Sequence, residues 1–186
     1  GGAVTGCNIE DIGDSALRAI DSVGLRIADN VIRRAGNNGI QVWRTAPGDD
    51  GTMVYDNRIE DIRADSGGDG PNGNAINVFR AGNVIVRGNR IDNCAFTAIR
   101  GNAASNIQIT GNTCSRLGEV AIFSEFAFEG ALIANNIIDR AAIGISVTNF
   151  NDGGRLAVVT GNILRNIRST APLQGIGLSI EADSIA

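Results

Sequence analysis

The sequence predicts an all-β fold, a right-handed solenoid of about seven rungs that each contain three short parallel strands. Two observations support this prediction. A pattern of apolar residues around one Asn position recurs seven times, and within each copy apolar residues alternate with polar ones, as they do along a β-strand. The Asn position is occupied, in order, by Cys7, Asn30, Asn57, Asn89, Asn112, Asn136 and Asn162.

Each copy supplies three strands. Neighbouring copies are 23, 27, 32, 23, 24 and 26 residues apart, a repeat length typical of a solenoid with insertions. The first strand has an aliphatic residue three positions before the Asn, such as Val54, and the second has one two positions after it, such as Ile59. The third begins with a small residue followed by an aliphatic one, as at Ala75 and Ile76. Equivalent strands of successive rungs should pair in parallel about 4.8 Å apart, and the usual hand of parallel connections predicts a right-handed coil.

The repeated Asn has a structural explanation. A two-residue bend such as the one at Gly88 and Asn89 needs residues that tolerate positive φ, and Gly and Asn both do. Stacked Asn side chains also hydrogen-bond to one another and to the backbone of the neighbouring rung. We therefore interpret these residues as scaffold rather than as a ladder of glycan or metal ligands.

Composition excludes several classes of function. The chain of 186 residues carries 16 basic residues, all of them Arg, against 20 acidic residues, and it has no His. A net charge of −4 argues against nucleic-acid binding, which usually needs a basic face. No apolar run approaches the roughly 20 residues that span a bilayer, so we expect no membrane insertion. Without His or Lys, a lyase or epimerase of this fold would need Arg or Tyr as its base.

The three cysteines, Cys7, Cys94 and Cys114, are predicted to be free thiols. Cys94 and Cys114 stand at positions that other repeats fill with aliphatic residues, so both should point inward as small buried hydrophobes. They also lie three positions apart within the pattern, which is unfavourable for a disulfide.

We expect residues 1–186 to form a single domain that is a fragment of a longer solenoid. The first residue, Gly1, already lies within a repeat, and the last residues read as the start of another strand. Solenoids need caps, and neither end resembles one. Open ends expose unpaired strands, so end-to-end or other homo-oligomeric association is expected.

The repeat resembles those of right-handed parallel β-helix proteins, the superfamily that includes pectate lyases. Three stretches are more specific: GNRIDNCAFTAIRGN (88–102), LGEVAIFSEF (117–126) and GGRLAVV (153–159). They are similar to an α-proteobacterial family of twin-arginine-exported repeat proteins of unknown function. This resemblance implies a periplasmic or extracellular location, with a leader outside the given sequence. It brings no established catalytic residues.

The candidate site lies where the repeat is interrupted, since insertions in solenoids map to loops on one face. The interruptions are residues 43–51, 63–74, 148–155 and 168–174, and all four flank the third strand of their repeats. Alternation predicts which side chains on the outer surface of that sheet form the floor of a groove. The candidate substrate-binding residues are Gln41, Trp43, Asn77, Phe79, Phe123 and Glu125.

These side chains suit sugar recognition, because aromatic rings stack on apolar sugar faces and planar polar groups bind hydroxyls. The alternative is that loops or a partner subunit cover the rings. Arg100, Asp65 and Asp69 are the candidate catalytic residues. Arg100 could also pair with the carboxylate of an acidic glycan, and Asp65 or Asp69 could act with Glu125 as a pair of carboxylates.

No metal site is predicted from ligand spacing. The string DSGGDG (65–70) offers oxygen ligands for Ca²⁺, but it does not match an EF-hand and is also ordinary turn chemistry. Two functions remain open at this point. One is an exported protein that binds, or binds and processes, an extracytoplasmic polysaccharide; the other is a non-enzymatic structural or adhesive solenoid of the cell-surface or phage-spike type.

Overall fold

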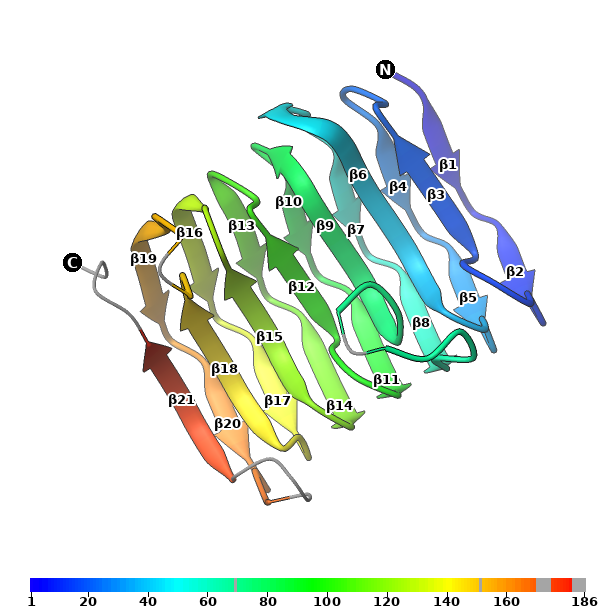
Figure 1. Ribbon diagram of the computed structural model, residues 1–186. Coiled ribbons are helices and arrows are strands. Elements are labelled where there is room, and N and C mark those ends of the chain that lie inside the picture. The colour runs from blue at the N-terminus through cyan, green and yellow to red at the C-terminus, as the bar shows by residue number, and fades with distance from the viewer. Residues whose placement is uncertain (69, 151, 170–174, 182–186) are drawn as a thin grey trace.

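The chain winds into a coil whose rungs follow one another from the N-terminal to the C-terminal end (Figure 1). The computed structural model describes residues 1–68, 70–150, 152–169 and 175–181. In these ranges the regular structure consists of 21 strands, and no helix is present. The all-β class is therefore confirmed.

The strands form three sheets of seven parallel strands each. The first sheet contains β1 (Ala3–Thr5), β4 (Arg26–Ala28), β7 (Met53–Tyr55), β10 (Ile85–Arg87), β13 (Ile107–Thr110), β16 (Glu129–Ala134) and β19 (Arg155–Thr160). The second contains β2 (Asn8–Glu10), β5 (Val31–Arg33), β8 (Arg58–Ile62), β11 (Arg90–Cys94), β14 (Thr113–Leu117), β17 (Ile137–Asp139) and β20 (Ile163–Arg165). The third contains β3 (Leu17–Ile20), β6 (Asn38–Asp49), β9 (Asn74–Gly82), β12 (Ile99–Asn102), β15 (Val120–Glu125), β18 (Ile143–Thr148) and β21 (Ile176–Glu181). Each rung gives one strand to every sheet, which confirms seven rungs of three strands.

Aliphatic side chains from the three sheets meet inside the coil. Val54 pairs with Val86 in the first sheet and Ile59 with Ile91 in the second, as the repeat predicts. Ile76, from the third sheet, joins them in one continuous core. Because each rung contributes only a few side chains, the core is a stack of thin layers along the coil.

The Asn residues form a continuous ladder at the corner between the first and second sheets. Nδ2 of Asn89 donates to Oδ1 of Asn112 at 3.0 Å and to the carbonyl of Val54 at 3.0 Å. The scaffold interpretation accounts for these contacts. The backbone detail differs from the expectation, because the positive φ falls on the residue before the ladder Asn, as at Gly88 (φ 64°) and Asp56 (φ 54°).

The interruption at 43–51 is an extension of a strand, so its prediction as a loop is wrong. β6 continues to Asp49, and after a register irregularity between Trp43 and Gly48 its last residues pair with Ala81 and Gly82 of β9. The extra residues therefore stay hydrogen-bonded to the next rung. The interruption at 63–74 is a true loop, which connects β8 to β9.

The last rung is shifted by two residues from the predicted alignment. The repeat places Ile176 in the same column as Ile145, whereas the structure pairs Ile145 with Leu178 and Ile143 with Ile176. Residues Ser179–Glu181, which were predicted to begin a new strand, belong to β21, and residues 182–186 lie outside the described ranges. The sequence is compatible with both alignments, because a Gly followed by an aliphatic residue occurs twice in succession, at Gly175–Ile176 and at Gly177–Leu178.

Candidate functional site

The outer face of the third sheet carries two parallel columns of side chains, and these contain every predicted substrate-binding residue. Strand register aligns each member with its neighbour on the next rung. The first column is Arg18, Gln41, Asn77, Arg100, Phe123, Ser146 and Ser179. The second column is Ile20, Trp43, Phe79, Asn102, Glu125, Thr148 and Glu181.

The part of this face formed by β6, β9 and β12 is contacted by the loop between β8 and β9. Its tip is fixed by side chains of the third sheet: Asn38 Nδ2 donates to the carbonyl of Pro71 at 2.8 Å, and Arg100 Nη1 donates to the carbonyl of Gly70 at 3.0 Å. Asn77 Nδ2 also reaches the carbonyl of Pro71, at 3.4 Å. Asn77 is therefore only 3% exposed and Arg100 only 8%. The floor is outward-facing, as predicted, but far less open than the sequence suggested.

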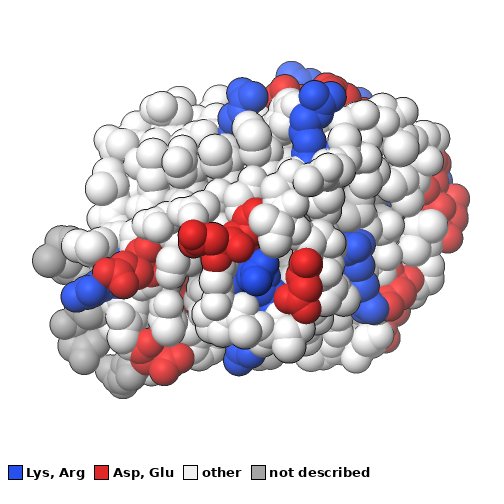
Figure 2. Space-filling model, turned by 90° about the horizontal axis from the view of Figure 1, so that it is seen from above, with Lys and Arg blue, Asp and Glu red and all other residues white. Residues whose placement is uncertain are grey.

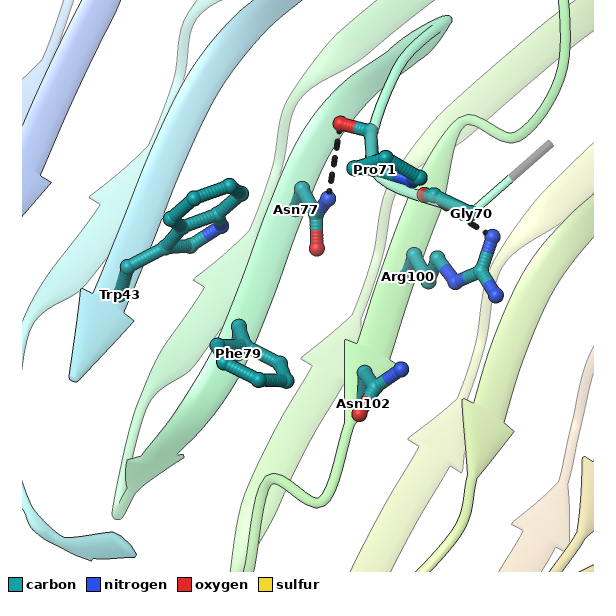
Figure 3. A pocket seen from close by; sticks show the side chains of 7 residues that line it. All are labelled: Trp43, Gly70, Pro71, Asn77, Phe79, Arg100 and Asn102. Atoms are coloured by element: carbon teal, nitrogen blue, oxygen red, sulfur yellow. Dashed lines mark hydrogen bonds between the residues drawn. The ribbon is translucent and has the colours of Figure 1, made fainter. Parts of the chain in front are cut away.

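Beside this loop lies a hollow of about 230 Å³, which we call the aromatic hollow (Figure 3). The rings of Trp43 and Phe79 stand edge to face with centroids 5.8 Å apart. The indole Nε1 of Trp43 is buried and has no hydrogen-bond partner among the described residues. The lining consists of Trp43, Gly70, Pro71, Asn77, Phe79, Arg100 and Asn102.

Arg100 forms a buried ion pair with Glu125 on the next rung. Arg100 Nε donates to Glu125 Oε1 at 2.5 Å, and Asn102 Nδ2 donates to the same oxygen at 2.9 Å. The guanidinium also lies over the ring of Phe123, with Cζ 5.3 Å from the centroid. Burial raises the pKa of the Glu125 carboxyl above its usual range, although the hydrogen bonds from Arg100 and Asn102 act in the opposite direction.

A second hollow, of about 380 Å³, lies on the C-terminal side of Arg100, and we call it the acidic hollow. Three carboxylate residues, Glu119, Glu125 and Glu181, contribute to its lining. Phe123 stands at one side, where its ring meets that of Phe150 with centroids 6.4 Å apart. Arg100 lines both hollows, so the ion pair separates an aromatic half of the face from an acidic half.

The predicted residues are therefore brought together only in part. Gln41 is 1% exposed and its Oε1 accepts a hydrogen bond from Arg18, so it supports the sheet rather than lining either hollow. Asp65 pairs with Arg63 at 2.9 Å and also lies outside both linings. Asp69 lies outside the described residues. Within those residues no group of three His, Cys, Asp or Glu side chains is arranged to hold a metal ion.

Sequence reasoning missed several residues of this face. Asn102 follows Arg100 by two positions, so alternation alone could have identified it. The carbonyls of Gly70 and Pro71 carry no periodic signal, because they belong to an irregular loop. Phe150 follows the end of β18 and reaches the acidic hollow from the connection to β19.

In the view of Figure 2, basic and acidic side chains lie close to one another, and much of the surface is uncharged. Several ion pairs join neighbouring rungs, such as Arg34 with Asp11 and Arg155 with Glu129. No helix suited to crossing a membrane occurs in the described ranges.

The family model described as a right handed beta helix region matches residues 1–153 and 47–184. The chain belongs to the right-handed β-helix family. This assignment agrees with the three parallel sheets and with the stack of aliphatic layers between them. Neither the curated proteins nor the solved structures contain a significant match to this β-helix.

Proposed function

We propose that this β-helix binds a polysaccharide along the outer face of its third sheet. The observation that carries the proposal is the aromatic hollow, where the half-buried rings of Trp43 and Phe79 stand beside the amides of Asn77 and Asn102. Aromatic rings bind the apolar faces of sugars, and side-chain amides donate to and accept from hydroxyl groups.

The dimensions suit one unit of a longer chain. A volume of about 230 Å³ is below the roughly 300–1,000 Å³ of pockets that enclose a drug-sized ligand. Successive strands lie about 4.8 Å apart, so the two hollows together extend over several rungs of the sheet. A polymer lying along the coil axis would place one ring in the aromatic hollow and its neighbours over the adjoining rungs.

The geometry favours binding without bond cleavage. A general acid or base must lie within hydrogen-bond reach of the proton that it transfers. Arg100 and Glu125 are committed to each other in a buried pair, and Asp65 is paired with Arg63 away from both hollows. The resemblance to exported repeat proteins supports the further proposal that the polysaccharide is met outside the cytoplasm.

The proposal can be tested by affinity electrophoresis against a panel of polysaccharides. Trp43→Ala should weaken the affinity for any bound polysaccharide, as measured from the retardation, about tenfold. This corresponds to the loss of one aromatic ring that stacks on a sugar. Tyr55→Ala is the matched control, because Tyr55 is an aromatic residue on the first sheet, where it packs against Arg87. Equal effects of the two substitutions, or no retardation of the parent protein, would contradict the proposal.

The second candidate, a structural or adhesive solenoid, is favoured by apolar side chains outside the third sheet. Ile137, Leu156, Val158 and Ile163 are each 39–57% exposed on the first and second sheets. Exposed apolar groups of this kind often mark interfaces between proteins. A protein that binds no polysaccharide but self-associates in sedimentation experiments would support this alternative.

A further inference from the structure

The charges around the two hollows are unevenly divided. Among the described residues, the lining of the aromatic hollow has one ionisable side chain, Arg100, and the acidic hollow adds Glu119, Glu125 and Glu181. A second arginine, Arg80, packs against Phe79 outside the lining, and its Nη1 donates to the carbonyl of Thr45 at 3.1 Å. Over the two hollows, three carboxylates therefore face one guanidinium.

That guanidinium is already engaged. Arg100 Nε donates to Glu125 at 2.5 Å and Nη1 donates to the carbonyl of Gly70 at 3.0 Å. Glu125 is 1% exposed. A ligand carboxylate that took Glu125's place would leave Glu125 as a buried charge without its partner, an arrangement that is strongly unfavourable. A sugar hydroxyl imposes no such exchange, because it can bind Asn77 or Asn102 while the ion pair stays intact.

We propose that this face recognises uncharged sugars and discriminates against uronic acids, with the Arg100–Glu125 pair as the specificity-determining element. The inference rests on the proposed polysaccharide binding and names its substrate class. It replaces the expectation that Arg100 pairs with the carboxylate of an acidic glycan. Arg100 acts instead as a positioning residue, which holds Glu125, Phe123 and the tip of the loop at Gly70 in place.

The experiment compares matched ligands that differ only in charge. Oligosaccharides of galacturonan, mannuronan and glucuronan, each beside its carboxyl-reduced form, are titrated into the protein by calorimetry. The reduced member of a bound pair should bind more tightly by about tenfold or more, because juxtaposed like charges are costly. Its affinity should also be nearly independent of salt concentration, since screening acts only on charge–charge interactions.

Glu125→Gln identifies the element responsible. This variant keeps an acceptor for Asn102 but releases the charge of Arg100, so the preference for the reduced ligand should shrink by about tenfold. Glu129→Gln is the matched control: it changes the net charge equally, but Glu129 lies on the first sheet and pairs with Arg155. That control should leave the preference unchanged.

The outcomes separate the two proposals. Equal or tighter binding of the acidic members by the parent protein would overturn this inference and leave polysaccharide binding intact. The inference also fails if folded Glu125→Gln keeps the parent's preference. If Glu125→Gln does not fold, the salt dependence of the parent protein's affinity for the acidic members decides. Affinity that rises with salt supports the inference, because screening relieves the repulsion between like charges, and affinity that is flat or weakens with salt overturns it. Binding of no ligand in the panel would overturn both proposals.

Discussion

Asn57 and Asn89 are 32 residues apart in the sequence but one rung apart in space, and Nδ2 of Asn57 donates to Oδ1 of Asn89 at 3.0 Å. The backbone N–H of Asn57 donates to the same oxygen at 3.0 Å. One side-chain oxygen thus satisfies two buried donors of the preceding rung. The ladder fixes the register between rungs, because a shift by one residue would leave these donors without an acceptor.

Asn89→Leu should therefore destabilise the protein severely. The substitution removes the Oδ1 that accepts from the backbone N–H and from Nδ2 of Asn57, and it removes the Nδ2 that donates to Asn112 and to the carbonyl of Val54, all of them buried. Each orphaned buried group costs about 1–3 kcal/mol, so we expect a loss of at least about 3 kcal/mol in the free energy of unfolding. Thermal and urea denaturation measure it. Arg90→Gln, at an exposed neighbouring position, should be almost silent, and a variant Asn89→Leu that melts like the parent would refute the role of the ladder.

The third sheet is sensitive to side-chain size where rungs approach most closely. A Cβ added to Gly39 would lie 2.5 Å from the carbonyl oxygen of Ala75 on the next rung, whereas one added to Gly48 would meet nothing nearer than 3.6 Å. Gly39→Ala should lower the unfolding free energy by about 1–3 kcal/mol, as overpacking usually does. Gly48→Ala, in the same strand, should change it little. Similar melting temperatures for the two variants would contradict this prediction.

The three thiols should differ sharply in reactivity. Cys7 is exposed, whereas Cys94 and Cys114 are buried in the core. Burial raises the pKa of the Cys114 thiol to about 12 and raises that of Cys94 as well. Because the thiolate is the reactive form, a thiol reagent such as DTNB should titrate one cysteine in the native protein and all three in denaturant. Rapid reaction of a second thiol under native conditions would show that the core opens.

Acid should destabilise the coil through carboxylates on the second sheet. The Arg116 guanidinium, which is ion-paired with Asp92, lowers the pKa of that carboxyl despite its partial burial. The unfolded chain, where the pKa is about 3.9, therefore binds a proton more readily than the folded one. The contribution of Asp92 is present above about pH 4 and is lost as the pH falls through the folded-state pKa.

Melting temperature measured from pH 7 to pH 2 tests this linkage. The parent should lose stability below about pH 4, and Asp92→Asn should make that loss shallower. Arg116→Gln should act similarly, because it removes the group that lowers the pKa. If the melting temperatures of both variants fall at low pH as steeply as that of the parent, this pair is not a source of the pH dependence.

The sequence was sufficient to predict most of the fold because each rung repeats the same requirements. Aliphatic columns such as Val54–Val86 and Ile59–Ile91 have to face one core, and the ladder Asn has to occupy one corner. Prediction failed where local composition and pairing disagree. Residues 46–49 contain Pro and Gly, as loops do, yet the end of this segment pairs with β9.

The direction of the site residues was predictable, but their environment was not. Alternation along a strand determines that Arg100 and Phe123 point outward, whatever lies above them. The burial of Arg100 depends on a loop whose carbonyls at Gly70 and Pro71 accept hydrogen bonds from side chains of β6, β9 and β12. Phe123 is covered instead by Arg100 and by Phe150. The contacts of the loop are made by backbone atoms of an irregular segment, which residue types do not reveal.

The Asn ladder also has a direction. From Asn30 to Asn162, each side-chain amide donates to the one on the following rung, so the amides are aligned head to tail along the coil. Aligned amide dipoles add, as peptide dipoles do in a helix, and each link polarises the next. The coil therefore has an electrical polarity, with the N–H ends of the amides directed toward the C-terminal rungs. Replacing a central member such as Asn89 splits this array into two short ones, whereas replacing Asn30 only shortens it. Two substitutions that remove the same number of local hydrogen bonds can therefore lower the stability of the coil by different amounts.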